Sequence, residues 1–367
     1  MKLTISRESL LDPLQLVAGV VGRRQTLPIL SNLLLVAEDN SLTITGTDQE
    51  VELTTKITDV EVAEAGELTV PARKLMDICR SLVDKASLTL KLDAGRLSFV
   101  SGSFRSHLAT LPAVDFPNVE PESEGSTVDV DSSLLSTLLS KTSFAMAQQD
   151  VRLFFNGVLV ELYKDKIRLV ATNGQRLATS FGEHQATEEL HQYIVPRKGV
   201  HELARLLSDA PEGDVALHFS RNHMRVSIAN AVLTTKLIDS TYPDYSRAIP
   251  GGGDKIMQGN RLEIREALNR TSILSNEMYR NVRLQLSSGK LDLHANNPLQ
   301  EEAEETVNIE YDGEPLEIAF NVGYLLETLS TMQGDTVRMT FIDNNNACVL
   351  TDPEDPNSLY VVSPMML

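Results

Sequence analysis

The stretch Val70–Leu82 reads VPARKLMDICRSL, and it returns 125 residues later as VPRKGVHELARLL over Val195–Leu207. Both copies begin with Val-Pro, continue with Arg-Lys, and then repeat apolar residues three and four positions apart. Proline is favoured in the first turn of a helix, where its missing N–H is not needed. The apolar spacing places one buried face along that helix. Each copy therefore predicts an amphipathic helix that starts directly after the proline.

A third copy follows at the same step, as FNVGYLLETLSTM over Phe320–Met332. Asn321 takes the place of Pro196, and asparagine is a good helix N-cap. The apolar face recurs at Val322, Leu325, Leu326 and Leu329. A long-period repeat of this kind indicates several copies of one structural unit.

Other landmarks keep the same register. LTITGTDQEVELT (Leu42–Thr54), IRLVATNGQRLAT (Ile167–Thr179) and LDLHANNPLQEEA (Leu291–Ala303) each hold a turn residue between two alternating strand patterns, which predicts three hairpins. An earlier helical pattern also recurs, at Leu10–Val21, Leu134–Met146 and Leu262–Leu274. We therefore expect six helices, over residues 7–24, 72–82, 133–148, 197–207, 261–272 and 321–332.

Two polar stretches separate the copies. PNVEPESEGST (Pro117–Thr127) and IPGGGDKIMQGN (Ile249–Asn260) have compositions that suit linkers. A chain of 367 residues is long enough for two or three domains with their own cores. We expect three domains, 1–122, 123–250 and 251–367, each with two helices and about eight strands. The fold class is α+β with antiparallel hairpins.

The net charge of −18 argues against a nucleic-acid binder when it is taken as an average. The charge is segregated, however, because the six expected helices carry 13 Lys and Arg against 7 Asp and Glu. Basic helices on an acidic body suit phosphate contact by the helices and repulsion of polyanions elsewhere. The alternative is that these residues only form solvated helix faces.

Several classes of protein find no support. No apolar run approaches the roughly 20 residues of a membrane helix, and MKLTISRESLL is too short and polar for a signal peptide. Only Cys79 and Cys348 are present, so a reducing cytoplasm is expected. We find no P-loop, nucleophile elbow or Rossmann pattern, and no catalytic residues, metal site or cofactor is expected. His218 and His223 lie across a predicted hairpin and are interpreted as surface residues.

No base-reading signature is present either, and Trp is absent. Stacking on single strands is therefore disfavoured, and sequence-independent contact with duplex DNA is the better hypothesis.

These residues resemble a known family, the bacterial replicative sliding clamp or beta subunit of DNA polymerase III. The matching stretches span nearly the whole chain in order, and include TLPIL, TGTD, VPARK, FAMAQQDVR, ATNGQRLA, YPDY, ANNPLQEEAEE, FNVGYLL and VVSPMML. The resemblance implies three repeated clamp domains, each with two helices packed on antiparallel sheets, in a ring formed by a head-to-tail homodimer. Helix packing distances of about 8 to 10 Å agree, since twelve helices leave a hole just over 20 Å wide whereas six leave no room for DNA.

The resemblance also implies three sets of site residues. The positions expected to contact DNA are Arg24, Arg73, Arg80, Gln149, Arg197, Lys198 and Arg205. The expected ring interface joins Lys74, Ile78, Arg96, Arg105 and Leu108 to Ile273, Leu274, Glu301, Glu302, Glu304 and Glu305 of the second copy. Opposite charges on facing strand edges make such an interface sensible, although EEAEE also fits a solvated edge. Ser103 and Ser106 depart from the family, which carries a basic and an aromatic residue there.

The third set is a pocket for short peptide motifs of a clamp loader, the replicative polymerase and repair polymerases. Its expected residues are Phe155, Thr172, Gly174, Arg176, Leu177, Pro243, Arg247, Tyr279, Asn321, Tyr324, Val361, Val362, Pro364, Met365 and Leu367. An apolar cleft with a few polar groups suits such peptides, although Val361–Leu367 also fits a last core strand. Phe155, Ser363 and Met366 depart from the family pattern.

The expected function is thus a non-catalytic clamp that encircles duplex DNA and tethers polymerases. A three-domain interaction scaffold that does not encircle DNA is the alternative, and an enzyme without recognised motifs is a third possibility.

Overall fold

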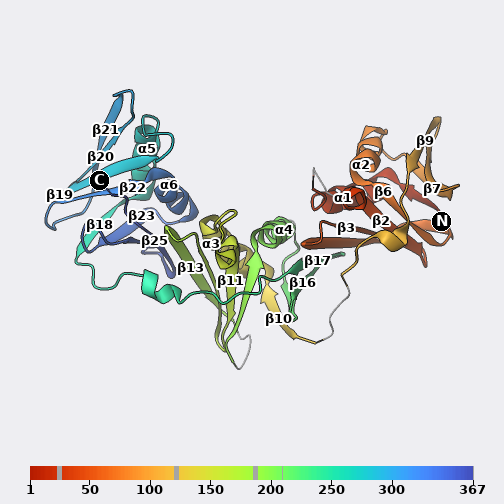
Figure 1. The fold of residues 1–367 in the computed structure, drawn as a ribbon, viewed down its shortest axis with the longest axis horizontal. Coiled ribbons are helices and arrows are strands. Elements are labelled where there is room, and N and C mark those ends of the chain that lie inside the picture. The colour runs from red at the N-terminus through yellow and green to blue at the C-terminus, as the bar shows by residue number, and fades with distance from the viewer. Residues whose placement is uncertain (23–26, 120–123, 185–188, 209, 367) are drawn as a thin grey trace. The chain divides into compact units, whose positions relative to one another are not determined.

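The computed structural model describes residues 1–22, 27–119, 124–184, 189–208 and 210–366. Arg24 and Leu367, two of the expected site residues, lie outside the described residues. The chain forms two compact units (Figure 1), unit 1 with residues 1–133 and 201–237 and unit 2 with residues 134–200 and 238–367. Among the described residues, no helix is long and apolar enough to cross a membrane.

Unit 1 contains two helices that lie side by side, α1 (Arg7–Ala18) and α2 (Ala72–Ser81) (Figure 1). Its smaller sheet has five strands in the order β5 (Glu61–Glu64), β1 (Lys2–Ser6), β7 (Ser87–Asp93), β8 (Arg96–Ser101) and β9 (Phe104–Ala109). All neighbours in this sheet are antiparallel.

The larger sheet of unit 1 has eight antiparallel strands. Their order is β10 (Ser126–Asp131), β15 (Asp214–Phe219), β16 (His223–Ile228), β17 (Ala231–Lys236), β4 (Val51–Ile57), β3 (Ser41–Thr47), β2 (Asn32–Glu38) and β6 (Gly66–Pro71). The step from β17 to β4 joins residues about 180 positions apart, with Ala231 opposite Thr55 and Thr235 opposite Val51. This sheet therefore runs without interruption across the expected boundary at residue 122.

The core of unit 1 lies between this sheet and α1. Leu33, Ile44 and Leu53 lie on the core-facing sides of β2, β3 and β4 and are fully buried, because alternate residues of a strand share one face. Leu14 and Val17 of α1 are equally buried. The helix comes so close that a Cβ on Gly46 would lie 2.8 Å from the Val17 side chain, so only glycine fits at that point of β3.

Unit 2 repeats the arrangement. Its larger sheet has the order β14 (His191–Pro196), β11 (Gly157–Leu162), β12 (Lys166–Thr172), β13 (Arg176–Glu183), β25 (Asp355–Val362), β24 (Cys348–Asp352), β23 (Thr336–Phe341) and β18 (Lys255–Asn260). Its smaller sheet has β21 (Glu302–Asn308), β20 (Lys290–Asn296), β19 (Asn281–Ser287) and β22 (Leu316–Asn321). The helices α5 (Arg261–Ser272) and α6 (Val322–Thr331) pack against each other.

The remaining helices are α3 (Ser132–Thr142) and α4 (Arg197–Ser208), with short 3-10 turns η1 (Pro28–Ser31), η2 (Ala113–Asp115), η3 (Ser143–Ala145), η4 (Leu153–Asn156) and η5 (Tyr245–Ala248). The helices that contain the three sequence copies are confirmed, and so are the three hairpins, as β3–β4, β12–β13 and β20–β21. The expected apolar faces are largely buried, for example at Leu75, Leu203 and Leu325, whereas Leu326 is half-buried.

Three details differ from the predictions. The first helix ends at Ala18 instead of residue 24, and Gly19 follows it. The third ends at Thr142, and the chain continues as a 3-10 turn. His218 and His223 are half-buried on the β15–β16 hairpin and are not fully exposed.

Candidate functional site

An apolar cluster lies on the larger sheet of unit 2. Its buried members come from neighbouring strands and from one connecting segment, and they are Leu159, Val170, Leu177, Ile194, Tyr242 and Val361. Leu177 of β13 lies directly opposite Val361 of β25. We call these six residues the Leu177 cluster. Further hydrophobic side chains pack partly buried against it, including Phe154, Tyr245 and Ile249.

Residues 238–249 hold one side of the Leu177 cluster. The N–H of Ile238 donates to the carbonyl of Ile194 at 2.9 Å. Further along, the Tyr245 hydroxyl donates to a Glu161 carboxylate oxygen at 2.7 Å and accepts from Arg168 at 3.1 Å. Burial raises the pKa of Tyr245 well above its ordinary value, so the phenol stays protonated and keeps donating.

Glu161 is 2% exposed, and a buried carboxylate is costly unless donors surround it. Besides Tyr245, it accepts from Tyr163 at 3.1 Å and from the Gln192 amide at 2.8 Å. Gln192 and Arg168 flank it on the neighbouring strands β14 and β12. We call this group the Glu161 network. It fastens Tyr245, and with it the expected pocket residues Pro243 and Arg247, to the sheet.

The β12–β13 turn contributes Thr172, Gly174 and Arg176. The Thr172 hydroxyl donates to the carbonyl of Arg176 at 2.6 Å and accepts from the N–H of Gly174 at 3.0 Å. Asn173 accepts from the N–H of Arg176, which closes the turn. Gly174 has φ +87°, and a Cβ there would lie 3.3 Å from Arg152 and 3.5 Å from Phe155. The turn thus brings Phe155 next to Gly174.

Arg176 is engaged inside the chain. Its side chain is 9% exposed, donates to the Phe144 carbonyl and pairs with Glu327 of α6. The guanidinium also lies over the rings of Phe144 and Tyr324, at 5.2 and 4.6 Å. Arg176 therefore joins β13 to α6, and Tyr324 is held beside it by a cation–π contact.

The C-terminal residues cross from β25 toward β22. Val362 lies opposite Arg176, the N–H of Ser363 donates to the carbonyl of Gln175, and the N–H of Met365 donates to the carbonyl of Ala319, both at 2.8 Å. Pro364 and Met365 are half-buried, whereas Met366 is fully exposed. This segment is a strand end followed by a short tail, as the interpretation as a last core strand expects for Val361 and Val362.

Asn321 caps α6, because its side chain accepts from the N–H of Gly323 at 2.9 Å. The same amide donates to the carbonyl of Tyr279 at 3.5 Å. Tyr279 itself is 59% exposed. Arg247 is exposed and pairs with Asp244 at 3.0 Å.

The structure therefore groups most of the expected peptide-binding residues around the Leu177 cluster and the adjacent turn. Arg152, Phe154, Tyr242 and Tyr245 also lie there, although they are not among the expected residues. Phe154 meets Phe155 edge-on at 4.6 Å and Tyr242 at 6.2 Å, and Arg152 lies 4.5 Å over Phe155. The sequence signal for Phe154, Tyr242 and Tyr245 is the aromatic content of LFF and YPDY in a chain that is poor in aromatic residues.

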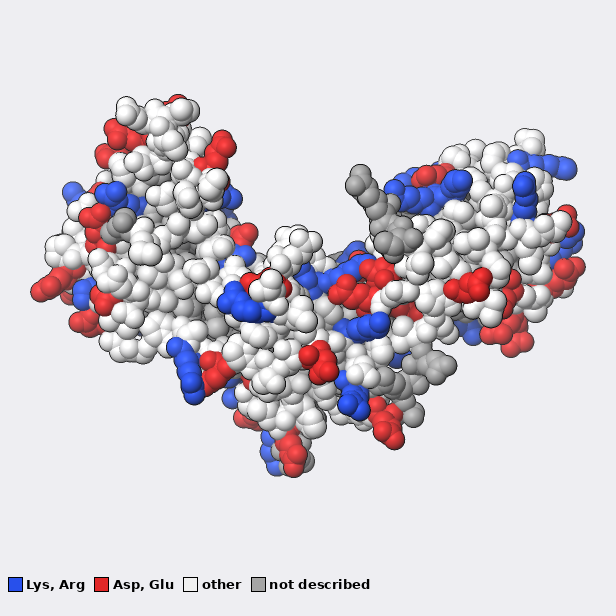
Figure 2. All heavy atoms as spheres, in the orientation of Figure 1, with Lys and Arg blue, Asp and Glu red and all other residues white. Residues whose placement is uncertain are grey.

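The expected DNA-contacting residues fall into two groups. Arg73, Arg80 and Gln149 are exposed. On the face shown in Figure 2, lysine and arginine side chains form several small groups, one of them over α2. Among the described residues, the side chains of Arg73 and Gln149 make no hydrogen bond or ion pair, and that of Arg80 contacts the Met76 sulfur at 3.8 Å.

The other group lies on α4 and is half-buried. Arg197 donates to the carbonyls of Met146 and Ala147 at 3.3 and 3.5 Å. Arg205 donates to Glu202 at 2.7 Å and to the carbonyl of Leu16, near the end of α1, at 2.8 Å. Lys198 is also half-buried and has an interaction of its own. Arg205 thus serves the packing of α4 on α1 within unit 1.

Most of the expected interface residues lie on or beside the edge strands β9 and β21 and the helices α2 and α5, whereas Arg96 lies on β8, the strand next to β9. β9 ends the five-stranded sheet and carries Arg105, and β21 ends the four-stranded sheet and carries the acidic run. Lys74, Arg96 and Ile273 are exposed, Ile78 and Leu274 are half-buried, and Leu108 is buried.

The acidic run is partly used within the chain. Glu305 accepts from Arg270 at 2.9 Å, and this contact lowers the pKa of the carboxyl. Glu304 contacts His294 at 3.1 Å, and Glu301 accepts from Asn297 at 2.7 Å. Glu302 is exposed. In the described part of the chain, no cluster of three His, Cys, Asp or Glu side chains is placed to hold a metal ion.

Comparison with known proteins covers the whole chain. Sequence models of the DNA polymerase III beta subunit match residues 1–120 with its N-terminal domain, 129–244 with its central domain and 246–366 with its C-terminal domain. The beta sliding clamp of Pseudomonas putida is 51% identical over 368 residues, and that of Escherichia coli K12 is 41% identical over 367 residues. Each alignment covers 100% of both chains.

Solved structures agree. The DNA polymerase III subunit beta of Pseudomonas aeruginosa superimposes with a TM-score of 0.96 at 49% identity, over 100% of both chains. A second structure of that protein, bound to griselimycin, gives a TM-score of 0.95 at 50% identity over the same coverage. The expected α+β fold of three clamp domains is confirmed. This chain belongs to the DNA polymerase III beta subunit family, the beta sliding clamps.

Proposed function

We propose that this chain works as a sliding clamp: two copies close head to tail into a ring around duplex DNA and tether polymerases to it. The chain has no catalytic role in this function and needs no cofactor, since retention comes from topology. The observation that carries the proposal is the full-length family match, joined to the apolar Leu177 cluster in unit 2. Two buried free cysteines suit the reducing cytoplasm of a bacterium.

The contact with DNA is electrostatic and independent of sequence. Arg73 and Arg80 are exposed on α2 and can meet phosphates as mobile, screened contacts. Gln149 is exposed too and can donate to the backbone. Contacts of this kind hold a ring near DNA and still let it move along.

The Leu177 cluster is the proposed docking site for short peptide motifs of the clamp loader, the replicative polymerase and repair polymerases. Its buried aliphatic floor, the exposed Tyr279 and the half-buried Met365 offer apolar surface beside a few polar groups. Such a mixture suits an apolar side chain carried on an extended peptide.

The ring is tested by its mass and by its retention on DNA. Light scattering at micromolar concentration is expected to give twice the 40.4 kDa of one chain. A species of 40.4 kDa that persists as concentration rises, with or without DNA and loader, would refute the two-chain ring.

DNA contact is tested by reversing charge at the exposed arginines. The double variant Arg73→Glu and Arg80→Glu is expected to lower loading onto a circular plasmid by loader and ATP. The matched control reverses Arg221 and Lys236, which are also exposed but lie off the helices. Equal loading by both double variants would count against the role assigned to α2.

A further inference from the structure

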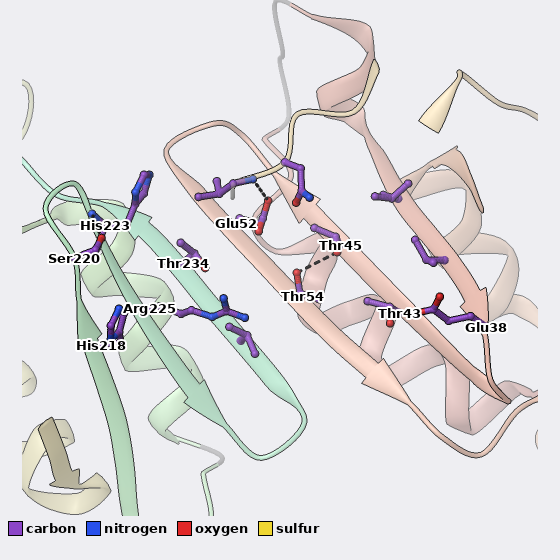
Figure 3. Close-up of a pocket in the computed structure, with 15 residues that line it drawn as sticks. Glu38, Thr43, Thr45, Glu52, Thr54, His218, Ser220, His223, Arg225 and Thr234 are labelled. Atoms are coloured by element: carbon purple, nitrogen blue, oxygen red, sulfur yellow. Dashed lines mark hydrogen bonds between the residues drawn. The ribbon is translucent and has the colours of Figure 1, made fainter. Parts of the chain in front are cut away.

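One face of the larger sheet in unit 1 is unusually polar. Side chains that share this face form a row across four strands, His218, Arg225, Thr234 and Glu52, in which each residue lies directly opposite the next. A second row holds Leu34, Thr45, Thr54 and Val232. Figure 3 shows these side chains around a hollow of about 360 Å³. We call this hollow the Glu52 cavity.

The internal repeat makes the Glu52 cavity the counterpart of the Leu177 cluster. Glu52 and Leu177 are 125 residues apart, and each follows the turn of its hairpin by the same number of positions. The strand partner is Thr234 for Glu52 and Val361 for Leu177. Thr45 likewise stands where Val170 stands in unit 2. The same place in two related sheets thus carries an apolar cluster in one and ionisable groups in the other.

Glu52 is incompletely paired for its depth. It is 7% exposed, and among the described residues it accepts one hydrogen bond, from the N–H of Val119 at 3.2 Å, through a single carboxylate oxygen. The pKa of this carboxyl is raised, because burial raises it by more than the Val119 hydrogen bond and the charge of Arg225 lower it. A buried carboxylate gains most from a further donor or a cation.

Arg225 is half-buried and makes no hydrogen bond or ion pair with any described residue. Its side chain extends from β16 toward β4 (Figure 3). Two strand spacings of about 4.8 Å separate its backbone from that of Glu52, with Thr234 on the strand between them. An open guanidinium fork in a recess suits a carboxylate.

We propose that the Glu52 cavity is a second peptide-docking site, which takes an extended polar segment with a basic side chain on Glu52 and a carboxylate on Arg225. At about 3.3 Å per residue, the two charges of the ligand lie two or three positions apart. The hydroxyls of Thr43 and Thr234 and the amide of Asn118 line the same hollow and can bond the peptide backbone. The analogy with the Leu177 cluster as a peptide site rests on the proposed function of that cluster. The charge pairing of a ligand with Glu52 and Arg225 does not depend on it.

The test selects ligands without assuming their sequence. A random heptapeptide library displayed on phage is panned on the immobilised full-length chain, with counter-selection on the double variant Glu52→Gln and Arg225→Gln. The expected peptides carry Lys or Arg two or three positions from Asp or Glu. Selection that enriches nothing over the double variant, or enriches peptides without this pairing, overturns the proposal.

Enriched peptides are then measured by fluorescence anisotropy against single variants. Glu52→Gln and Arg225→Gln are each expected to weaken binding about tenfold or more, as for loss of one charge-assisted contact. Glu38→Gln, an exposed carboxyl on the rim of the cavity, is the matched control and is expected to change little.

Leu177→Ala separates this proposal from the main one. If binding falls in Leu177→Ala and not in Glu52→Gln, the peptides occupy the Leu177 cluster, and the second site is refuted while the first gains support. If the ring tests fail but the Glu52 and Arg225 effects hold, the second site stands by itself.

Discussion

The Glu161 network gives the most direct prediction about the peptide site. Tyr245→Phe removes one hydroxyl that donates to Glu161 at 2.7 Å and accepts from Arg168 at 3.1 Å. Glu161 keeps its other two donors, so its carboxylate loses one hydrogen bond but is still hydrogen-bonded. Losing a hydrogen bond to a charged group costs about 1.5 to 3 kcal/mol. That cost falls on the attachment of residues 238–249 to the sheet.

The assay is hydrogen–deuterium exchange of the full-length chain, read on a peptide that covers residues 242–249. The N–H groups of Arg247 and Ile249 are bonded within this segment, to Asp244 and Ser246 at 3.4 and 3.2 Å. If exchange proceeds by local opening, a loss of about 1.5 to 3 kcal/mol speeds it roughly 10- to 100-fold. Peptide binding at the Leu177 cluster is expected to weaken in parallel, because Pro243 and Arg247 belong to the loosened segment.

Tyr163→Phe is the matched control. It also removes a donor to Glu161, at 3.1 Å, but Tyr163 follows directly after β11 and lies outside the segment. Exchange over 242–249 is expected to rise far less in this variant. Equal acceleration in both variants, or none in Tyr245→Phe, would refute the idea that the Tyr245 hydroxyl anchors the segment.

Two further predictions concern titrating groups. Hydrogen bonds from Arg152 lower the pKa of Asp150 from 3.8 to about 2, so the contact is intact above pH 4 and is lost as the pH falls toward 2. A carboxyl titration by NMR is expected to show this midpoint, and the variant Arg152→Gln is expected to return it toward 3.8. A midpoint that does not move in the variant would disprove the pairing. Burial raises the pKa of the Cys79 thiol to about 11 and that of Cys348 well above its usual range, so both are expected to resist a thiol reagent at pH 8 in the native chain and to react on unfolding. Rapid labelling of either thiol in the folded protein would contradict the burial.

Most of the fold could be predicted from local patterns in the sequence. Leu75 and Cys79 recur at helical spacing and are fully buried, and the turn around Asn173 lies between two strands as its neighbours indicated. Each of these features depends on residues a few positions apart. The first helix was overestimated because its apolar spacing continues through Val20 and Val21, which are buried after the helix has ended.

Long-range pairing was beyond the sequence. An alternating pattern shows which face of a strand is buried, but it does not show which distant strand lies beside it. The partner strand and the register are fixed only when the faces pack. The continuation of β4 into β17 was therefore missed. The same limit applies to side chains: the position of Arg205 and Arg176 in the sequence does not show that Glu202, Glu327 and main-chain carbonyls contact them. Only the folded structure shows which contacts a charged side chain already makes within the chain.

The continuous sheets have a mechanical consequence. Five residue pairs join β17 to β4, and five join β13 to β25, each ladder lying inside one compact unit. A force along these strands would act on all the hydrogen bonds of a ladder at once. The β17–β4 and β13–β25 connections, which join segments that match different domains of the family, are therefore expected to be stiff and not to act as hinges. The outer edges of β9 and β21, like those of the other edge strands, carry no such ladder within the described sheets. If the ring forms as proposed, its weakest seams are these edges, where one chain ends and the next begins.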